Sequence, residues 1–242
     1  MIPLKDENPT ELTPVVTVAL IALNLAAWFL LQGAGEARVL EASVYSYGAI
    51  PCEITARCAP EGLAWGGILS SMFMHGGWEH ILGNMLFLWV FGNNIEDSMG
   101  HLRFLIFYLL CGVSAGLAHV YFNVASDVPA VGASGAISGI MGAYVLLYPK
   151  ALVRTWLPPF FFFDLRAVFF LGYWFILQLF MASAVFGAEA GEQGGIAVWA
   201  HVGGFVVGLA LVKVFENRAL TGARRSKVRL TRDELARTRP WL

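Results

Sequence analysis

Residues 200–208 read Ala-His-Val-Gly-Gly-Phe-Val-Val-Gly and place one ionisable side chain, His201, inside the apolar stretch Ile196–Phe215. If this stretch crosses a bilayer, an ionisable residue within it is costly and needs a functional reason. Gly204 and Gly208 are four residues apart and share one face of a helix, where small residues let a second helix approach closely. The stretch therefore predicts a membrane helix that packs tightly on a partner and carries a polar group.

The composition places the whole chain in the membrane class. Of its 242 residues, 57% are hydrophobic and 14% are charged, whereas soluble domains contain about 45–50% apolar and about 25% charged residues. The apolar stretches that we expect to span the membrane are Pro14–Leu31, His80–Phe91 with its flanks, Phe104–Phe122, Ser134–Tyr148, Ala167–Phe186 and Ile196–Phe215. The sequence thus predicts an all-α membrane protein, a bundle of six transmembrane helices.

Basic residues indicate the orientation of this bundle. If both termini are cytoplasmic, every one of the 16 Lys and Arg residues except Arg38 and Arg57 lies in a cytoplasmic segment or, for Lys213, at the cytoplasmic end of the last stretch, as the positive-inside rule requires. We therefore expect a cytoplasmic N-terminal segment at residues 1–13, the six-helix domain at 14–215 and a basic cytoplasmic tail at 216–242.

The outer loop, at about residues 32–79, is too apolar for a plain linker, and we expect it to form a cap partly embedded in the membrane. Cys52 and Cys58 lie six residues apart within it. They form a small disulfide if they face an oxidising compartment, although two free thiols fit the sequence equally well. Cys111 falls inside a predicted helix, where we expect it to be packed.

The second predicted helix carries a polar face. His80 and Asn84 are four residues apart and share that face. Both side chains can donate a hydrogen bond to an oxygen. Interhelical hydrogen bonding, which is common in membrane bundles, explains this pair as well as catalysis does.

The fourth predicted helix begins with Gly132-Ala133-Ser134-Gly135. Ser134 lies at a helix N-terminus, where free N–H groups and the helix dipole favour a developing anion. By itself this string also fits an ordinary helix cap. However, Gly135 and Gly139 form a second close-packing face, which would bring the fourth and sixth helices together and Ser134 within reach of His201. A nucleophile, a base and oxyanion donors in one layer are the minimum for acyl transfer.

These residues resemble the rhomboid family of intramembrane serine proteases. The match covers about residues 10–215, and its motifs occur in the family's order on the second, fourth and sixth helices: His75…His80-x-x-x-Asn84, Gly132-Ala133-Ser134-Gly135 and Ala200-His201-x-Gly-Gly-x-x-x-Gly208. The resemblance implies a catalytic dyad of Ser134 and His201. It implies that His80, Asn84 and the Ser134 backbone N–H stabilise the oxyanion, with supporting residues His75, Gly132, Gly135, Gly204 and Gly208.

The resemblance also reaches two further segments. Glu96 and Gly100 look like the family's structural turn after the second helix, and Trp174 and Phe175 lie in a segment similar to its lateral substrate gate, although aromatic packing explains these residues equally well. One position departs from the family: many relatives carry an aromatic residue four positions after the nucleophile, where this chain has Ser138.

The resemblance implies substrates that are transmembrane segments of other proteins, cut near the outer face. We expect no cofactor or metal, and the lack of an evident transit peptide or extra soluble domain favours a prokaryotic plasma membrane. A catalytically inactive rhomboid-like protein that binds membrane clients is the alternative, but such proteins usually lack the serine or the histidine. A metal site or transporter built on His75, His80 and His201 is disfavoured by their spacing. No basic stripe interleaved with aromatic residues points to nucleic acid.

Overall fold

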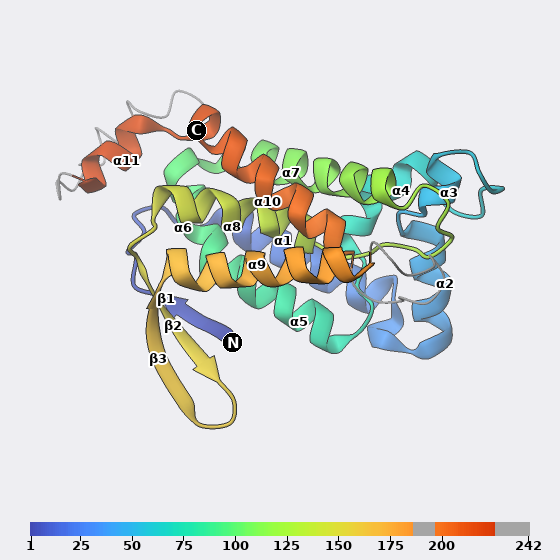
Figure 1. The fold of residues 1–242 in the computed structure, drawn as a ribbon, viewed down its shortest axis with the longest axis horizontal. Coiled ribbons are helices and arrows are strands. Elements are labelled where there is room, and N and C mark those ends of the chain that lie inside the picture. Colours follow the sequence, from blue (N-terminus) through green and yellow to red (C-terminus); the bar gives the residue numbers. More distant parts are fainter. Residues whose placement is uncertain (186–196, 226–242) are drawn as a thin grey trace.

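Each of the six apolar stretches folds as a helix in the computed structural model, which describes residues 1–185 and 197–225. These helices lie alongside one another in a bundle (Figure 1). They are α1 (Val15–Leu30), α5 (Trp78–Phe87) continued by the π-helical segment η4 (Leu88–Gly92) and α6 (Asn93–Met99), α7 (His101–Phe122), α8 (Ser134–Leu147), α9 (Ala167–Val185) and α10 (Val198–Phe215). By length and apolar composition, α7 and α10 are long enough to cross a membrane, whereas α1, α8 and the Ala167–Ala182 part of α9 are apolar but shorter.

The outer loop folds into short helices that cover one end of the bundle. These are η1 (Gly33–Gly35), α2 (Ala37–Tyr47), α3 (Pro51–Ile54), η2 (Ala64–Gly66), α4 (Gly67–Ser70) and η3 (Ser71–Phe73). Cys52 and Cys58 form a disulfide at the end of α3. The sequence fitted a disulfide and two free thiols equally well, and the structure contains the disulfide. Cys111 is a buried free thiol, as expected.

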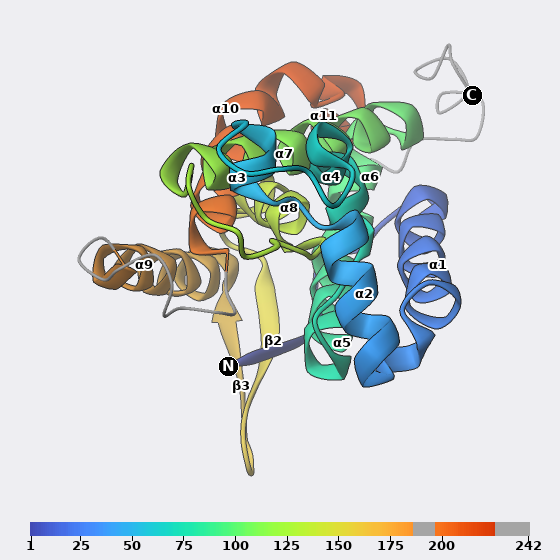
Figure 2. The ribbon, with the colours of Figure 1, turned by 90° about the vertical axis from the view of Figure 1, so that its right-hand side faces the viewer.

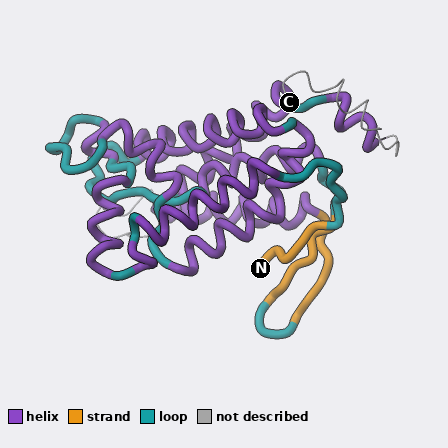
Figure 3. Tube along the Cα trace, turned by 180° about the vertical axis from the view of Figure 1, so that it is seen from behind, coloured by secondary structure: helices purple, strands orange, loops and turns teal. Residues whose placement is uncertain are grey.

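A three-stranded sheet at the opposite end was not expected from the sequence, which predicted an all-α protein. Its strands are β1 (Ile2–Asp6), β2 (Leu152–Leu157) and β3 (Phe161–Arg166), antiparallel in the order β1-β2-β3. The aromatic and β-branched residues of the loop after α8 favour strands, and the N-terminal segment adds the third strand by pairing with β2. The strands and the short helix α11 (Arg218–Arg225) lie at the same end of the bundle (Figure 3).

Glycines bring α8 and α10 into backbone contact, as their spacing predicted. A Cβ atom added to Gly204 would lie 2.0 Å from the carbonyl oxygen of Gly135, and one added to Gly208 would lie 2.0 Å from that of Gly139. Only residues without a side chain allow this approach. Most residues of α8 are buried, and α10 packs on this helix along the glycine seam.

Two buried carboxylates join α6 to the start of α1. Glu96 accepts hydrogen bonds from the backbone N–H groups of Val16 and Thr17, at 2.9 and 2.8 Å. Asp97 accepts the N–H of Leu12 at 2.8 Å. Free N–H groups at a helix N-terminus need such acceptors. Gly100, with a φ of 83°, then turns the chain into α7, so the Glu96–Gly100 turn predicted after the second helix has a structural basis.

Candidate active site

Ser134 and His201 meet across the glycine seam. Ser134 is the first residue of α8 and His201 is the fourth residue of α10. Their side chains are hydrogen-bonded, with 2.7 Å between Ser134 Oγ and His201 Nε2. This contact depends on the seam, because any side chain at Gly204 would collide with the Gly135 carbonyl oxygen and separate the two helices. The predicted approach of the two residues is therefore present in the structure.

Helix α9 supplies the second partner of the imidazole. Gln178, which is buried, places its Oε1 atom 2.9 Å from His201 Nδ1. An amide oxygen can only accept, so Nδ1 carries the proton in the neutral ring and the Nε2 lone pair faces the Ser134 hydroxyl. This is the tautomer that a general base requires.

Trp174 also contacts the imidazole from α9. The centroids of the Trp174 and His201 rings are 5.7 Å apart at an interplanar angle of 44°. Ser138, at the position where many relatives have an aromatic residue, instead donates a hydrogen bond from Oγ to the Ser134 carbonyl oxygen at 2.6 Å. The aromatic contact with His201 is thus made by Trp174 on α9 and not by residue 138 on α8.

Gly132 separates Ser134 from His80. Its φ is 127°, a conformation that favours glycine. A Cβ atom there would lie 2.7 Å from His80 Nε2 and 3.4 Å from Ser134 Oγ, and the Gly132 N–H donates to the Ser71 carbonyl oxygen at 2.9 Å. His80 and Ser134 therefore flank one fixed glycine.

The two predicted oxyanion donors differ in how they are held. The His80 Nδ1 atom accepts the N–H of Gly76 at 3.3 Å, which leaves the proton on Nε2, the nitrogen beside Gly132. The Asn84 side chain is buried, and its Nδ2 atom has no hydrogen-bond partner among the described residues. Buried polar groups without partners are uncommon and call for an explanation.

His75 supports His80 from behind. Its ring is fully buried and meets the His80 ring edge to face, with centroids 5.1 Å apart. Gln32, just after α1, holds the His75 backbone through two hydrogen bonds, of 2.9 Å to its N–H and 2.8 Å to its carbonyl oxygen.

Sequence reasoning assigned no role to Gln32 and named Gln178 only as part of the segment that resembles the lateral gate. Gln178 carries an amide within the apolar stretch Ala167–Phe186, and this isolated polar side chain could have indicated a functional role. Gln32 stands at the boundary of a predicted helix, where a polar residue is ordinary.

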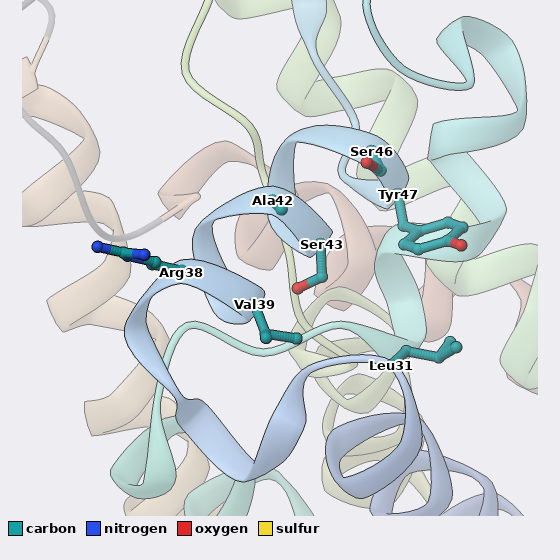
Figure 4. Close-up of a pocket in the computed structure, with 7 residues that line it drawn as sticks. All are labelled: Leu31, Arg38, Val39, Ala42, Ser43, Ser46 and Tyr47. Carbon is teal, nitrogen blue, oxygen red and sulfur yellow. The ribbon is translucent and has the colours of Figure 1, made fainter.

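A surface hollow of about 360 Å³ lies elsewhere, along α2 (Figure 4). Its lining consists of Leu31, Arg38, Val39, Ala42, Ser43, Ser46 and Tyr47. None of the predicted site residues lines it. Within residues 1–185 and 197–225, no group of three or more His, Cys, Asp or Glu side chains could hold a metal ion.

Comparison with known proteins identifies the family of this chain. Residues 63–218, more than half of the chain, match the model of the rhomboid domain. The chain belongs to the rhomboid family. Rhomboid-family proteins are integral membrane proteins, and so is this chain.

Several rhomboid relatives share part of this sequence. It is 36% identical over 145 residues to rhomboid protease GluP of Bacillus subtilis, a match that covers 59% of this chain and 27% of GluP. It is 28% identical over 140 residues to putative rhomboid protease YdcA of the same organism, which covers 57% of this chain and 64% of YdcA. Rhomboid-like protein 11 of Arabidopsis thaliana is 33% identical over 84 residues, 35% of this chain and 30% of that protein. The chain thus spans about a quarter to two thirds of these relatives.

Proposed function

We propose that this rhomboid-family chain is a serine endopeptidase that cuts transmembrane segments of other proteins near the outer face. The observation that carries the proposal is the 2.7 Å contact between Ser134 Oγ and His201 Nε2. A serine hydroxyl is a weak nucleophile until a neighbouring base accepts its proton. This pair meets that requirement, and both partners are held by packed helices.

In the proposed reaction, Ser134 Oγ attacks the scissile carbonyl carbon while its proton moves to His201 Nε2. The peptide C–N bond then breaks, and the leaving amine takes the same proton. His201 is positively charged in between. The Gln178 oxygen on Nδ1–H, at 2.9 Å, keeps the ring oriented and stabilises that charge. A water molecule then attacks the acyl carbonyl by the same steps, with His201 again accepting and returning the proton, and releases the acyl group from Ser134.

The negative charge on the substrate oxygen needs donors on the same side as the nucleophile. His80 Nε2–H lies beside Gly132 and close to Ser134. Asn84 offers an unengaged Nδ2 group, and the first turn of α8 offers backbone N–H groups. Preorganised donors of this kind supply a large part of the catalysis of acyl transfer.

The proposed topology has six spans within residues 14–215, with the segment 1–13 and the tail 216–242 in the cytoplasm of a prokaryotic cell. The short helices at residues 32–79 then cap the outer face. Of the tail, residues 226–242 lie outside the described part of the structure.

Substrate access is proposed to occur beside α9. This helix lies at the edge of the bundle (Figure 2). Phe175 stacks on Phe205 of α10 with centroids 4.3 Å apart, and Trp174 lies 6.3 Å from the same ring. A membrane-spanning substrate that reaches Ser134 from the lipid would displace these aromatic contacts first. Trp174 and Phe175 are therefore the proposed gate.

The decisive experiment compares wild-type protein with Ser134→Ala on a panel of single-span substrates in detergent or liposomes. Ser114→Ala, on α7, serves as the matched control. We expect cleavage by wild type and Ser114→Ala, none by Ser134→Ala, and labelling of Ser134 by a fluorophosphonate probe. Wild-type protein that binds these substrates but neither cuts them nor reacts with the probe would support the inactive client-binding alternative.

A further inference from the structure

The hairpin of β2 and β3 ends in an apolar tip. Residues 156–163 read Trp-Leu-Pro-Pro-Phe-Phe-Phe-Phe, eight positions without a charged or hydroxyl side chain. The side chains at the turn are open, with Phe160 82% and Phe161 66% exposed. Contiguous apolar surfaces of this kind mark an interaction site.

The hairpin projects to the side of the helices. β3 ends at Arg166 and α9 begins at the next residue. From this junction the hairpin turns away from the bundle, and its tip lies beside the helices, clear of them, in two perpendicular views (Figures 1 and 2). The tip is therefore exposed to the same surroundings as the ends of the helices.

The charged side chains of the hairpin lie outside its tip, between the middle of the strands and the base. Arg154 and Asp164 pair across the two strands at 3.1 Å, and Lys150 and Arg166 are exposed beside the start of α9. Basic residues at the base and aromatic residues at the tip match the change from headgroups to acyl chains at a bilayer surface.

The tip also satisfies its own polar side chain. The indole Nε1–H of Trp156 donates to the Pro159 carbonyl oxygen at 3.2 Å, so the ring can leave water without losing a hydrogen bond. The outer edge of β3 has no strand partner among the described residues, and unpaired backbone groups are excluded from the hydrocarbon core. These two features favour the interfacial region over deep insertion.

The exposed face of α9 also carries aromatic side chains. Phe169 and Tyr173 are 64% and 50% exposed, and in an integral membrane protein such side chains face lipid. We propose that residues 156–163 insert into the interfacial layer of the bilayer and anchor the first turn of α9. Assignment to the cytoplasmic leaflet rests on the proposed topology, whereas the insertion itself does not.

Phe161→Cys carrying an environment-sensitive fluorophore tests this proposal in full-length protein in phosphatidylcholine–phosphatidylglycerol liposomes. Phe169→Cys is the lipid-facing control and Glu61→Cys, in the outer loop, is the aqueous control. We expect Phe161→Cys to resemble Phe169→Cys in its blue-shifted emission, with stronger quenching by lipids spin-labelled near the headgroup than by lipids labelled near the chain end.

Emission and iodide quenching like those of Glu61→Cys would overturn the proposal. A blue shift that appears only at high protein-to-lipid ratio would also overturn it, because a second copy of the chain would then be the partner. The measurement is repeated in the Ser134→Ala background, so its outcome does not depend on whether the chain is a protease.

Discussion

The two sides of the candidate site are built differently. Along the seam, α8 and α10 touch backbone to backbone through Gly135, Gly139, Gly204 and Gly208. On the other side, α9 meets α10 through large aromatic rings, and a Cβ atom added to Gly172 on α9 would meet nothing within 4 Å. The seam leaves no room for adjustment, whereas the contact of α9 can change without a backbone clash.

This difference separates positioning from access. The proposed nucleophile and base are held by the contact that cannot relax, and the helix beside which substrate entry is proposed is held by contacts that can. Gln178 is the exception, because it lies on the adjustable helix and yet orients His201. If α9 moves as proposed for substrate access, the orientation of His201 would therefore change as well.

Gly204→Val tests the seam and carries the largest expected effect. The new side chain would collide with the Gly135 carbonyl oxygen, so the helices must separate or the protein must unfold. Since a misplacement of about 1 Å costs about 10²-fold in rate, we expect cleavage below detection and a clear loss of thermal stability. Gly172→Val on α9 is the matched control and should retain both. Activity in Gly204→Val would show that the seam is not required.

Asn84→Ala tests the donor without a partner. If the amide binds the developing oxyanion, its loss should lower kcat by up to about 10²–10³-fold while KM changes little. Gly83→Ala, whose added Cβ would meet nothing within 4 Å, controls for changes in α5. An unchanged kcat would remove Asn84 from the mechanism.

Gln178→Met tests the link between the two sides. Methionine keeps the length of the side chain but provides only a weak acceptor, and a lost hydrogen bond of about 1–1.5 kcal/mol corresponds to roughly a tenfold lower rate. We expect kcat to fall about tenfold with KM unchanged, and Gln178→Glu, which retains an oxygen acceptor, to restore most of the rate. Equal loss in both variants would indicate a purely packing role for residue 178.

The double variant Cys52→Ser and Cys58→Ser should have the smallest effect. The disulfide closes a short loop far along the chain from Ser134 and His201, and a loop of this size contributes about 2 kcal/mol at most. We expect a melting temperature a few degrees lower and a cleavage rate within twofold of wild type. A large loss of activity would show that the outer cap positions the catalytic residues.

Much of this protein follows from local sequence. Charge-free stretches of sufficient length predict the helices, and glycines at a spacing of four on two helices predict the seam. The six helices agree with the predicted stretches to within a few residues, apart from the longer second helix, which extends from Trp78 to Met99. The pairing of Ser134 with His201 was predictable because both motifs lie beside these glycines.

Other features depend on contacts between distant segments, which no local pattern records. Gln178, on a third helix, is the hydrogen-bond partner of His201 Nδ1, and the first residues of the chain form the third strand of the sheet. Each contact arises only after the bundle has brought its elements together. The sequence by itself determined which segments are helices and which two of them touch. The tertiary structure alone decided what orients the base and where the aromatic hairpin projects, because both depend on how α9 lies against the seam.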